Sequence, residues 1–234
     1  MRGPAANHDA KLAELEQRIG YAFNDRALLR EAVTHGSVHE GKKQKRDYDR
    51  LEFLGDRVLG LCVAERLLAE HQTDQEGDLA PRYNSLVNRH ACARAARAAG
   101  LGEAIVLSPA EEAHGGRQKE AILGDVCEAV IAALYLDGGL ETARGFITRF
   151  WGNAFEDARG VRQDAKTALQ EWAAAKKKHL RYVEVGQSGP EHEPHFIIEA
   201  HVEGFQPMRG EGGSKRDAQR AAAEAFLKAR GERD

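Results

Sequence analysis

The chain has 234 residues, of which 42% are hydrophobic and 30% are charged, and its formal net charge is −3. This length is enough for one medium domain and one small domain, and the slightly acidic balance excludes nucleic-acid binding through bulk positive charge. The sequence shows no apolar segment long enough to span a membrane and no apolar core of a secretory signal, which predicts a cytoplasmic protein without membrane partners. Cys62, Cys92 and Cys127 lack a CxxC spacing and are interpreted as core residues.

Residues 11–157 show one helical pattern after another. Apolar residues recur with the 3.6-residue period of an α-helix, alanine is frequent, and glycines such as Gly20, Gly77 and Gly100 separate the segments. Because the strict alternation of a strand is missing from this stretch, we expect an all-α domain with bounds at residues 8–157.

Two acidic pairs stand out in this domain. Glu52 and Asp56 are four residues apart in the run RLEFLGD, on a helix predicted for residues 48–71, so both acids share one helix face. Asp125 and Glu128 are three residues apart on a second helix, predicted for residues 119–136. Apolar residues surround each pair, so neighbouring negative charges lie at the edge of a buried surface, where they normally need a cation.

The ligand chemistry of these acids indicates which cation. Carboxylate oxygens without His or Cys partners favour magnesium or manganese over zinc, and such ions usually act on phosphates. A single acidic pair is more often part of a solvated helix face, capping the helix or pairing with arginine. Two pairs, each embedded in apolar residues, make a divalent-metal site the better interpretation.

The periodicity changes after a short polar stretch, residues 158–162, which is predicted to be a linker. Asp164 can cap a helix that runs to about Lys178, and Ser214 can cap a final helix to about Ala229. Between them, residues 182–185, 196–200 and 205–209 are predicted strands, with a tight turn at residues 203–204. We therefore expect an α-β-β-β-α domain over residues 163–231.

The run RLEFLGD at residues 50–56 and the later block GDVCEA at residues 124–129 resemble the ribonuclease III family of double-strand-specific endoribonucleases. Asp49 stands where that family commonly has glutamate, and Glu76 matches a family position near the site. The resemblance implies metal-binding and catalytic roles for four residues and supporting roles for two. The four are Glu52, Asp56, Asp125 and Glu128, and the two are Asp49 and Glu76.

The runs KTALQE at residues 166–171 and GEGGSKRDA at residues 210–218 resemble a double-stranded-RNA-binding domain. A glycine-rich loop before a helix offers free N–H groups and a positive dipole end to a phosphate, and nearby cations add to this. Polar side chains of the first helix and of a following loop can reach ribose hydroxyls in the shallow groove of an A-form duplex. The predicted RNA contacts are Thr167, Gln170, Glu171, His192, Ser214, Lys215, Arg216 and Arg220.

Taken together, the resemblance implies a homodimeric endoribonuclease that uses Mg²⁺, with Mn²⁺ as a possible substitute, to hydrolyse double-stranded RNA. It also implies 5′-phosphate and 3′-hydroxyl product ends and a task in processing ribosomal RNA precursors and other structured RNAs, messenger RNA included. One alternative is a non-catalytic RNA-binding protein that keeps the nuclease scaffold for dimerisation. Another is a helical nucleotide phosphohydrolase, which the RNA-binding module argues against.

Overall fold

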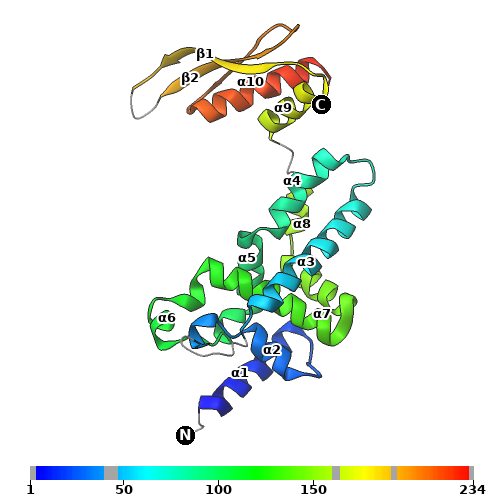
Figure 1. The fold of residues 1–234 in the computed structure, drawn as a ribbon, viewed down its shortest axis with the longest axis vertical. Helices are drawn as coiled ribbons and strands as arrows, with labels where there is room; N and C mark the ends of the chain where they lie inside the picture. Colours follow the sequence, from blue (N-terminus) through cyan, green and yellow to red (C-terminus); the bar gives the residue numbers. More distant parts are fainter. Residues whose placement is uncertain (1–3, 40–46, 160–163, 191–193, 232–234) are drawn as a thin grey trace. The chain divides into compact units, whose positions relative to one another are not determined.

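The computed structural model describes residues 4–39, 47–159, 164–190 and 194–231 (Figure 1). The chain divides into two compact units, Met1–Val161 and Arg162–Asp234, and each unit has its own hydrophobic core. Within the described ranges, no helix is both long enough and apolar enough to cross a membrane. Most of the predicted linker, residues 160–162, falls outside the described residues.

The first unit is helical, as the periodicity predicts. Its described α-helices are α1 (Pro4–Ile19), α2 (Arg26–Ala32), α3 (Asp49–Glu70), α4 (Glu76–Val87), α5 (Arg89–Ala99), α6 (Pro109–Ala113), α7 (Glu120–Trp151) and α8 (Ala154–Arg159). Three short 3₁₀ helices, η1 (Gly36–His39), η2 (Leu101–Glu103) and η3 (Gly116–Gln118), lie between them. The expected all-α architecture of this unit is confirmed.

Helices α3 and α7 form the centre of the first unit, where α7 packs against both α3 and α5. The observed bounds of α3 match the predicted helix to within one residue at each end. Helix α7 runs past its predicted end at Leu136, but Gly139 has a φ of +80° and breaks the helix there. Because glycine adopts positive φ without a steric penalty, this residue joins two helical segments at a kink.

The second unit has the predicted α-β-β-β-α order. It consists of α9 (Ala165–Ala175), β1 (Leu180–Ser188), β2 (His195–Val202), β3 (Met208–Gly212) and α10 (Lys215–Ala229). The strands form an antiparallel sheet in the order β1-β2-β3. Both helices lie on one side of this sheet (Figure 1) and share a core with it, since Leu169 of α9 and Phe226 of α10 are buried with Val202 of β2.

The third strand differs from its predicted position at residues 205–209, because β3 begins only at Met208. Gly204 has a φ of +81°, and the N–H of Phe205 donates to the carbonyl of Val202, so the predicted tight turn is present. Phe205 then packs its ring against Trp172 and Phe226 instead of continuing a strand. Pro207 lacks an N–H for a strand ladder, which favours the later start.

The glycine-rich segment before α10, predicted as a phosphate-binding loop, also has a packing role. Gly210 and Gly212 belong to β3, and a Cβ on Gly210 would lie 2.1 Å from the backbone nitrogen of Ala222. These glycines therefore allow α10 to pack closely on the strand. The loop is reduced to Gly213 and Ser214, and the Ser214 hydroxyl caps α10 by accepting from the N–H of Asp217 at 3.1 Å.

Candidate active site

Helices α3 and α7 cross in close contact at Gly55. A Cβ at this position would lie 1.7 Å from the backbone carbonyl oxygen of Glu128, so only glycine permits the approach. The run RLEFLGD thus combines an acidic pair with the residue that lets a second helix approach it. The crossing places Glu52 and Asp56 of α3 beside Asp125 and Glu128 of α7.

Because of this close crossing, alanine substitutions at two glycines should change the stability of the fold in opposite directions. Gly55→Ala is expected to destabilise the fold by about 1–3 kcal/mol, the usual cost of overpacking, and to reduce activity by separating the helices. Gly145 of α7 is exposed and has nothing within 4 Å of its Cβ position, so Gly145→Ala is expected to stabilise by up to about 1 kcal/mol. Thermal unfolding of both variants decides this, and equal melting temperatures would refute the steric argument.

The four carboxylates are partly buried, and their charges act on one another. Burial raises the pKa of Glu128 to about 7, and the charges of Asp56, Glu52 and Asp125 contribute to the rise. The pKa of Glu52 is raised by burial and then by the charge of Asp125. Burial also raises the pKa of Asp125. The structure therefore brings the four predicted residues into one electrostatically coupled cluster.

Three of these carboxylates have a hydrogen-bonding or ionic partner. The Tyr48 hydroxyl donates to Oδ2 of Asp125 at 3.5 Å, a long contact. The buried Cys92 thiol donates to Oε1 of Glu128, with 3.5 Å between sulfur and oxygen. Asp56 forms an ion pair with Arg57. These contacts orient the acids but leave part of their negative charge uncompensated.

The structure adds residues near the acids that the sequence analysis did not assign to the site. Arg89, the first residue of α5, carries a positive charge that lowers the pKa values of both Glu52 and Asp125, against the larger effect of burial. Tyr48 is buried, and burial together with the charge of Asp125 raises its pKa. In the sequence, only their positions could have indicated that Tyr48 and Arg89 belong to the site. Tyr48 lies just before RLEFLGD, and Arg89 follows a capping asparagine.

The chemistry of this cluster fits a hard divalent cation. Mutual repulsion among partly buried carboxylates is relieved by a bound ion, and oxygen donors suit Mg²⁺ or Mn²⁺. In the described residues, however, no three Asp, Glu, His or Cys side chains are arranged so that they could hold an ion as they stand. Small side-chain rotations would redirect the carboxylate oxygens toward a shared ion.

The two predicted supporting residues lie in different places. Asp49 begins α3, and its negative charge contributes to the raised pKa values of Glu52 and Asp125. Glu76 begins α4 and lines a groove beside Ala64, Leu67 and Leu68 of α3. At 1.5 Å per residue, this part of α3 lies roughly 12 to 24 Å along the helix from Asp56 and Glu52. Within one chain, the structure therefore joins Asp49 but not Glu76 to the acidic cluster.

The predicted RNA-contacting residues occupy two neighbouring helices. Thr167, Gln170 and Glu171 are exposed on α9, at the i, i+3 and i+4 spacing that places them on one face. The first turns of α10 present the exposed cations Lys215, Arg216 and Arg220, next to the cap Ser214. The Lys166 ammonium of α9 donates to Gln219 Oε1 of α10 at 2.7 Å, so these helix ends lie side by side. His192 lies outside the described residues.

Comparison with known protein families gives two matches, one within each unit. A Ribonuclease-III-like family model matches residues 25–153. A model of the double-stranded RNA binding motif matches residues 165–229. The first match covers both helices that carry the acidic cluster, and the second spans nearly all of the α-β-β-β-α unit.

Proteins named Ribonuclease 3 align with almost the whole chain. The one from Phenylobacterium zucineum is 52% identical over 220 residues, which are 93% of this chain and 92% of the relative. The one from Caulobacter vibrioides is 47% identical over 224 residues, which are 95% and 97% of the two chains. A solved nuclease domain of ribonuclease III from Campylobacter jejuni is 42% identical with a TM-score of 0.56, covering 61% of this chain and 96% of that one. The chain therefore belongs to the ribonuclease III family of endoribonucleases, with a helical nuclease domain followed by a double-stranded-RNA-binding domain.

Proposed function

We propose that the chain hydrolyses double-stranded RNA as a homodimer with Mg²⁺, which Mn²⁺ can replace, leaving 5′-phosphate and 3′-hydroxyl ends. Residues 8–157 would form the nuclease domain and residues 163–231 the RNA-binding domain. The observation that carries the proposal is the coupled acidic cluster at the close crossing of α3 and α7. Substrates would be ribosomal RNA precursors and other structured RNAs, messenger RNA included, in the cytoplasm where these RNAs are made.

In this proposal Glu52, Asp56, Asp125 and Glu128 would hold the divalent ion. A bound ion of this kind lowers the pKa of a water and offsets charge on the phosphate. The Tyr48 hydroxyl and the Cys92 thiol restrict the orientation of Asp125 and Glu128 through their hydrogen bonds. In the hydrolysis, water adds to phosphorus, the bond to the 3′ oxygen breaks, and that oxygen takes up a proton.

The second unit would position the duplex without reading its sequence. The exposed α9 face with Thr167 and Gln170 suits ribose hydroxyls in the minor groove, and the start of α10 suits backbone phosphates.

The direct test of the proposed activity is to incubate the pure protein and Mg²⁺ with a long RNA duplex, single-stranded RNA or duplex DNA. We expect cleavage of the RNA duplex alone, and end-group analysis should find 5′-phosphates. Equal cleavage of all three would refute the proposal.

The homodimer is supported by an apolar stripe on α3. Phe53, Leu61 and Leu68 are 66%, 49% and 65% exposed, which is unusual for large apolar residues on a central helix. At 100° per residue, these three side chains fall within about 80° of arc around the helix. They lie on one side of α3, beside the face that carries Glu52 and Asp56, and between Phe53 and Leu61 the Arg57 guanidinium stacks on the Phe53 ring. A second copy of the chain would remove this apolar surface from water.

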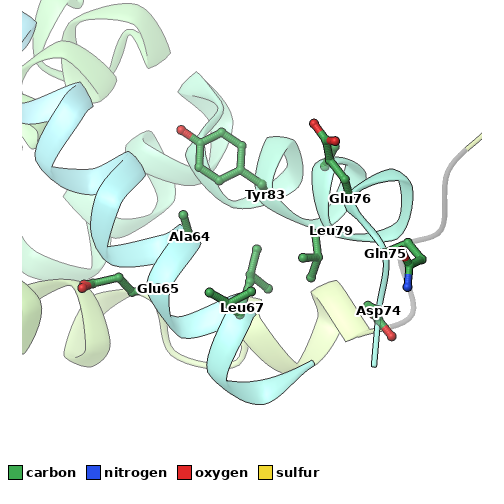
Figure 2. Close-up of a pocket in the computed structure, with 10 residues that line it drawn as sticks. Ala64, Glu65, Leu67, Asp74, Gln75, Glu76, Leu79 and Tyr83 are labelled. Carbon is green, nitrogen blue, oxygen red and sulfur yellow. The ribbon is translucent and has the colours of Figure 1, made fainter. Parts of the chain in front are cut away.

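A groove at one end of the stripe indicates how two copies would pack. This groove of about 640 Å³ has a mostly apolar surface formed by α3, α4 and the loop between them, and Figure 2 shows Ala64 and Leu67 of α3 opposite Leu79 of α4. Phe53 projects at the other end of the same helix. A twofold axis across the middle of α3 would run the two helices antiparallel and bring Phe53 of each copy to the groove of the other. The dimer interface of this proposal is therefore self-complementary.

This packing would also account for Glu76. The carboxylate lines the groove at the start of α4, as Figure 2 shows, far from the acidic cluster of its own chain. An antiparallel partner would bring Glu76 of the partner subunit toward the end of α3 that carries Glu52. The supporting role predicted for Glu76 would then act across the interface.

Phe53→Asp is expected to dissociate the dimer, because it places a charge where an aromatic ring would be buried. The measurement is molar mass by light scattering, and the expected result is the mass of one chain instead of two. Val185→Asp introduces the same charge at an apolar residue that is 48% exposed in the second unit, and this control should remain dimeric. A dimeric Phe53→Asp protein would show that another surface mediates association. For comparison, the Campylobacter jejuni nuclease domain has a region involved in dimer formation.

A further inference from the structure

The cation at the start of α10 that is best placed for a phosphate already has an anionic partner. The Lys215 ammonium lies 2.7 Å from Oε2 of Glu184, which belongs to β1, the edge strand opposite β3. The same ammonium lies 5.6 Å from the centre of the Phe196 ring. Phe196 belongs to β2, the strand between β1 and β3. The Lys215 side chain is therefore directed toward a strand carboxylate, although it is still largely exposed.

The other cations at this helix end differ from Lys215. Arg216 forms no ion pair with any residue that the structure describes. Arg220 pairs with Asp217 within its own helix, at a longer distance of 3.5 Å. The Lys215–Glu184 contact is thus the one in this group that joins α10 to a distant strand at hydrogen-bonding distance. Both side chains are partly exposed, at 61% and 36%, so a ligand in solution can reach them.

We propose that Glu184 is an internal competitor of RNA at Lys215, with its carboxylate occupying the place of a backbone phosphate in the free protein. This inference rests on the proposed binding of double-stranded RNA. A carboxylate oxygen and a phosphate oxygen accept from the same ammonium donors, so duplex binding exchanges one anion for the other. If Lys215 contacts both at once, the negative charge of Glu184 still faces the phosphate and weakens the complex.

The expected size of the effect follows from the exposure of the pair. Exposed ion pairs contribute about 0.2–1 kcal/mol, which corresponds to a factor of about 1.4 to 5 in an equilibrium constant. Glu184→Gln removes the charge but keeps the shape, so it should tighten duplex binding by a factor of about 1.4 to 5 at low salt. A gain in duplex affinity is easy to distinguish from damage to the fold, because a damaged fold would bind the duplex more weakly.

The test uses the full chain in four forms: wild type, Glu184→Gln, Lys215→Ala and the double variant. Duplex affinity is measured by fluorescence anisotropy with Ca²⁺ in place of Mg²⁺. We expect Glu184→Gln to tighten binding in the wild-type background and to have less than about half that effect, in free energy, when Lys215 is alanine. Glu224→Gln removes the same charge from an exposed position later on α10 and should change little.

The remaining outcomes would overturn the inference in distinct ways. Equal gains from Glu184→Gln and Glu224→Gln would show an effect of net charge alone. An undiminished gain in the Lys215→Ala background would show that Glu184 repels RNA without acting through Lys215. Weaker binding by Glu184→Gln would show that the carboxylate orients Lys215 for the phosphate. If wild type itself did not bind the duplex, the proposed function would fail first, and the inference with it.

Discussion

Replacement of Glu128 by glutamine is expected to reduce cleavage of duplex RNA by at least about 100-fold, because even groups that only support a metal ligand contribute 10- to 100-fold. The amide keeps the shape of the side chain but lacks the charge that holds a divalent ion. Duplex binding should survive, since the predicted RNA contacts are on the second unit. A gel shift in Ca²⁺ beside a cleavage assay in Mg²⁺ separates the two effects.

The same substitution should stabilise the metal-free protein. Because the pKa of Glu128 rises from 4.5 to about 7 in the folded chain, its negative charge costs stability that grows as pH rises through this window. Glutamine has no such charge. With EDTA present, the variant should therefore melt at a higher temperature than wild type at pH 8, and the difference should disappear near pH 4.

Glu141→Gln makes the same change on the same helix, α7, at a carboxylate that is 82% exposed and pairs with Arg144. This control should cleave like wild type. Near wild-type cleavage by Glu128→Gln would remove Glu128 from the mechanism, whatever its effect on stability.

The fold was largely predictable because its signals are local. Helical periodicity placed α3, and the capping residues Asp164 and Ser214 marked the starts of α9 and α10, where both side chains accept backbone N–H groups. The acidic pairs were also visible, since i, i+3 and i+4 spacing on an apolar helix needs no tertiary information. The start of β3 was wrong because the aromatic packing of Phe205 depends on residues that are distant in sequence.

The contacts around the acids could not be predicted from spacing. Cys92 and Glu128 are 36 residues apart, and Tyr48 and Asp125 are 77 apart, so only the packed helices bring them together. Interpreting Cys92 as a core residue was correct but incomplete, because its thiol also contacts a site carboxylate. Likewise, Lys215 was predicted as a phosphate-binding cation, and its pairing with Glu184 follows from sheet geometry that the sequence does not show.

A chain shortened to end at Ala158 is expected to remain a dimer and to cleave duplex RNA at about 50 mM salt but not measurably at about 200 mM. The stripe on α3 and the acidic cluster both belong to the first unit, which has its own core. The Campylobacter jejuni nuclease domain, solved without a second domain, shows that a related domain folds separately. What is lost is the set of cations at the start of α10, and with them much of the affinity for phosphates.

The KM and kcat of the shortened chain distinguish a loss of RNA affinity from a defect in the catalytic step. If the second unit only supplies affinity, the shortened chain should show a much higher KM with a nearly unchanged kcat at saturating duplex. Light scattering on the same preparation should give the mass of two chains. A monomer that does not cleave even at low salt would place the dimer interface or part of the active site in the second unit. A dimer with normal KM but low kcat would instead show that the second unit takes part in the catalytic step.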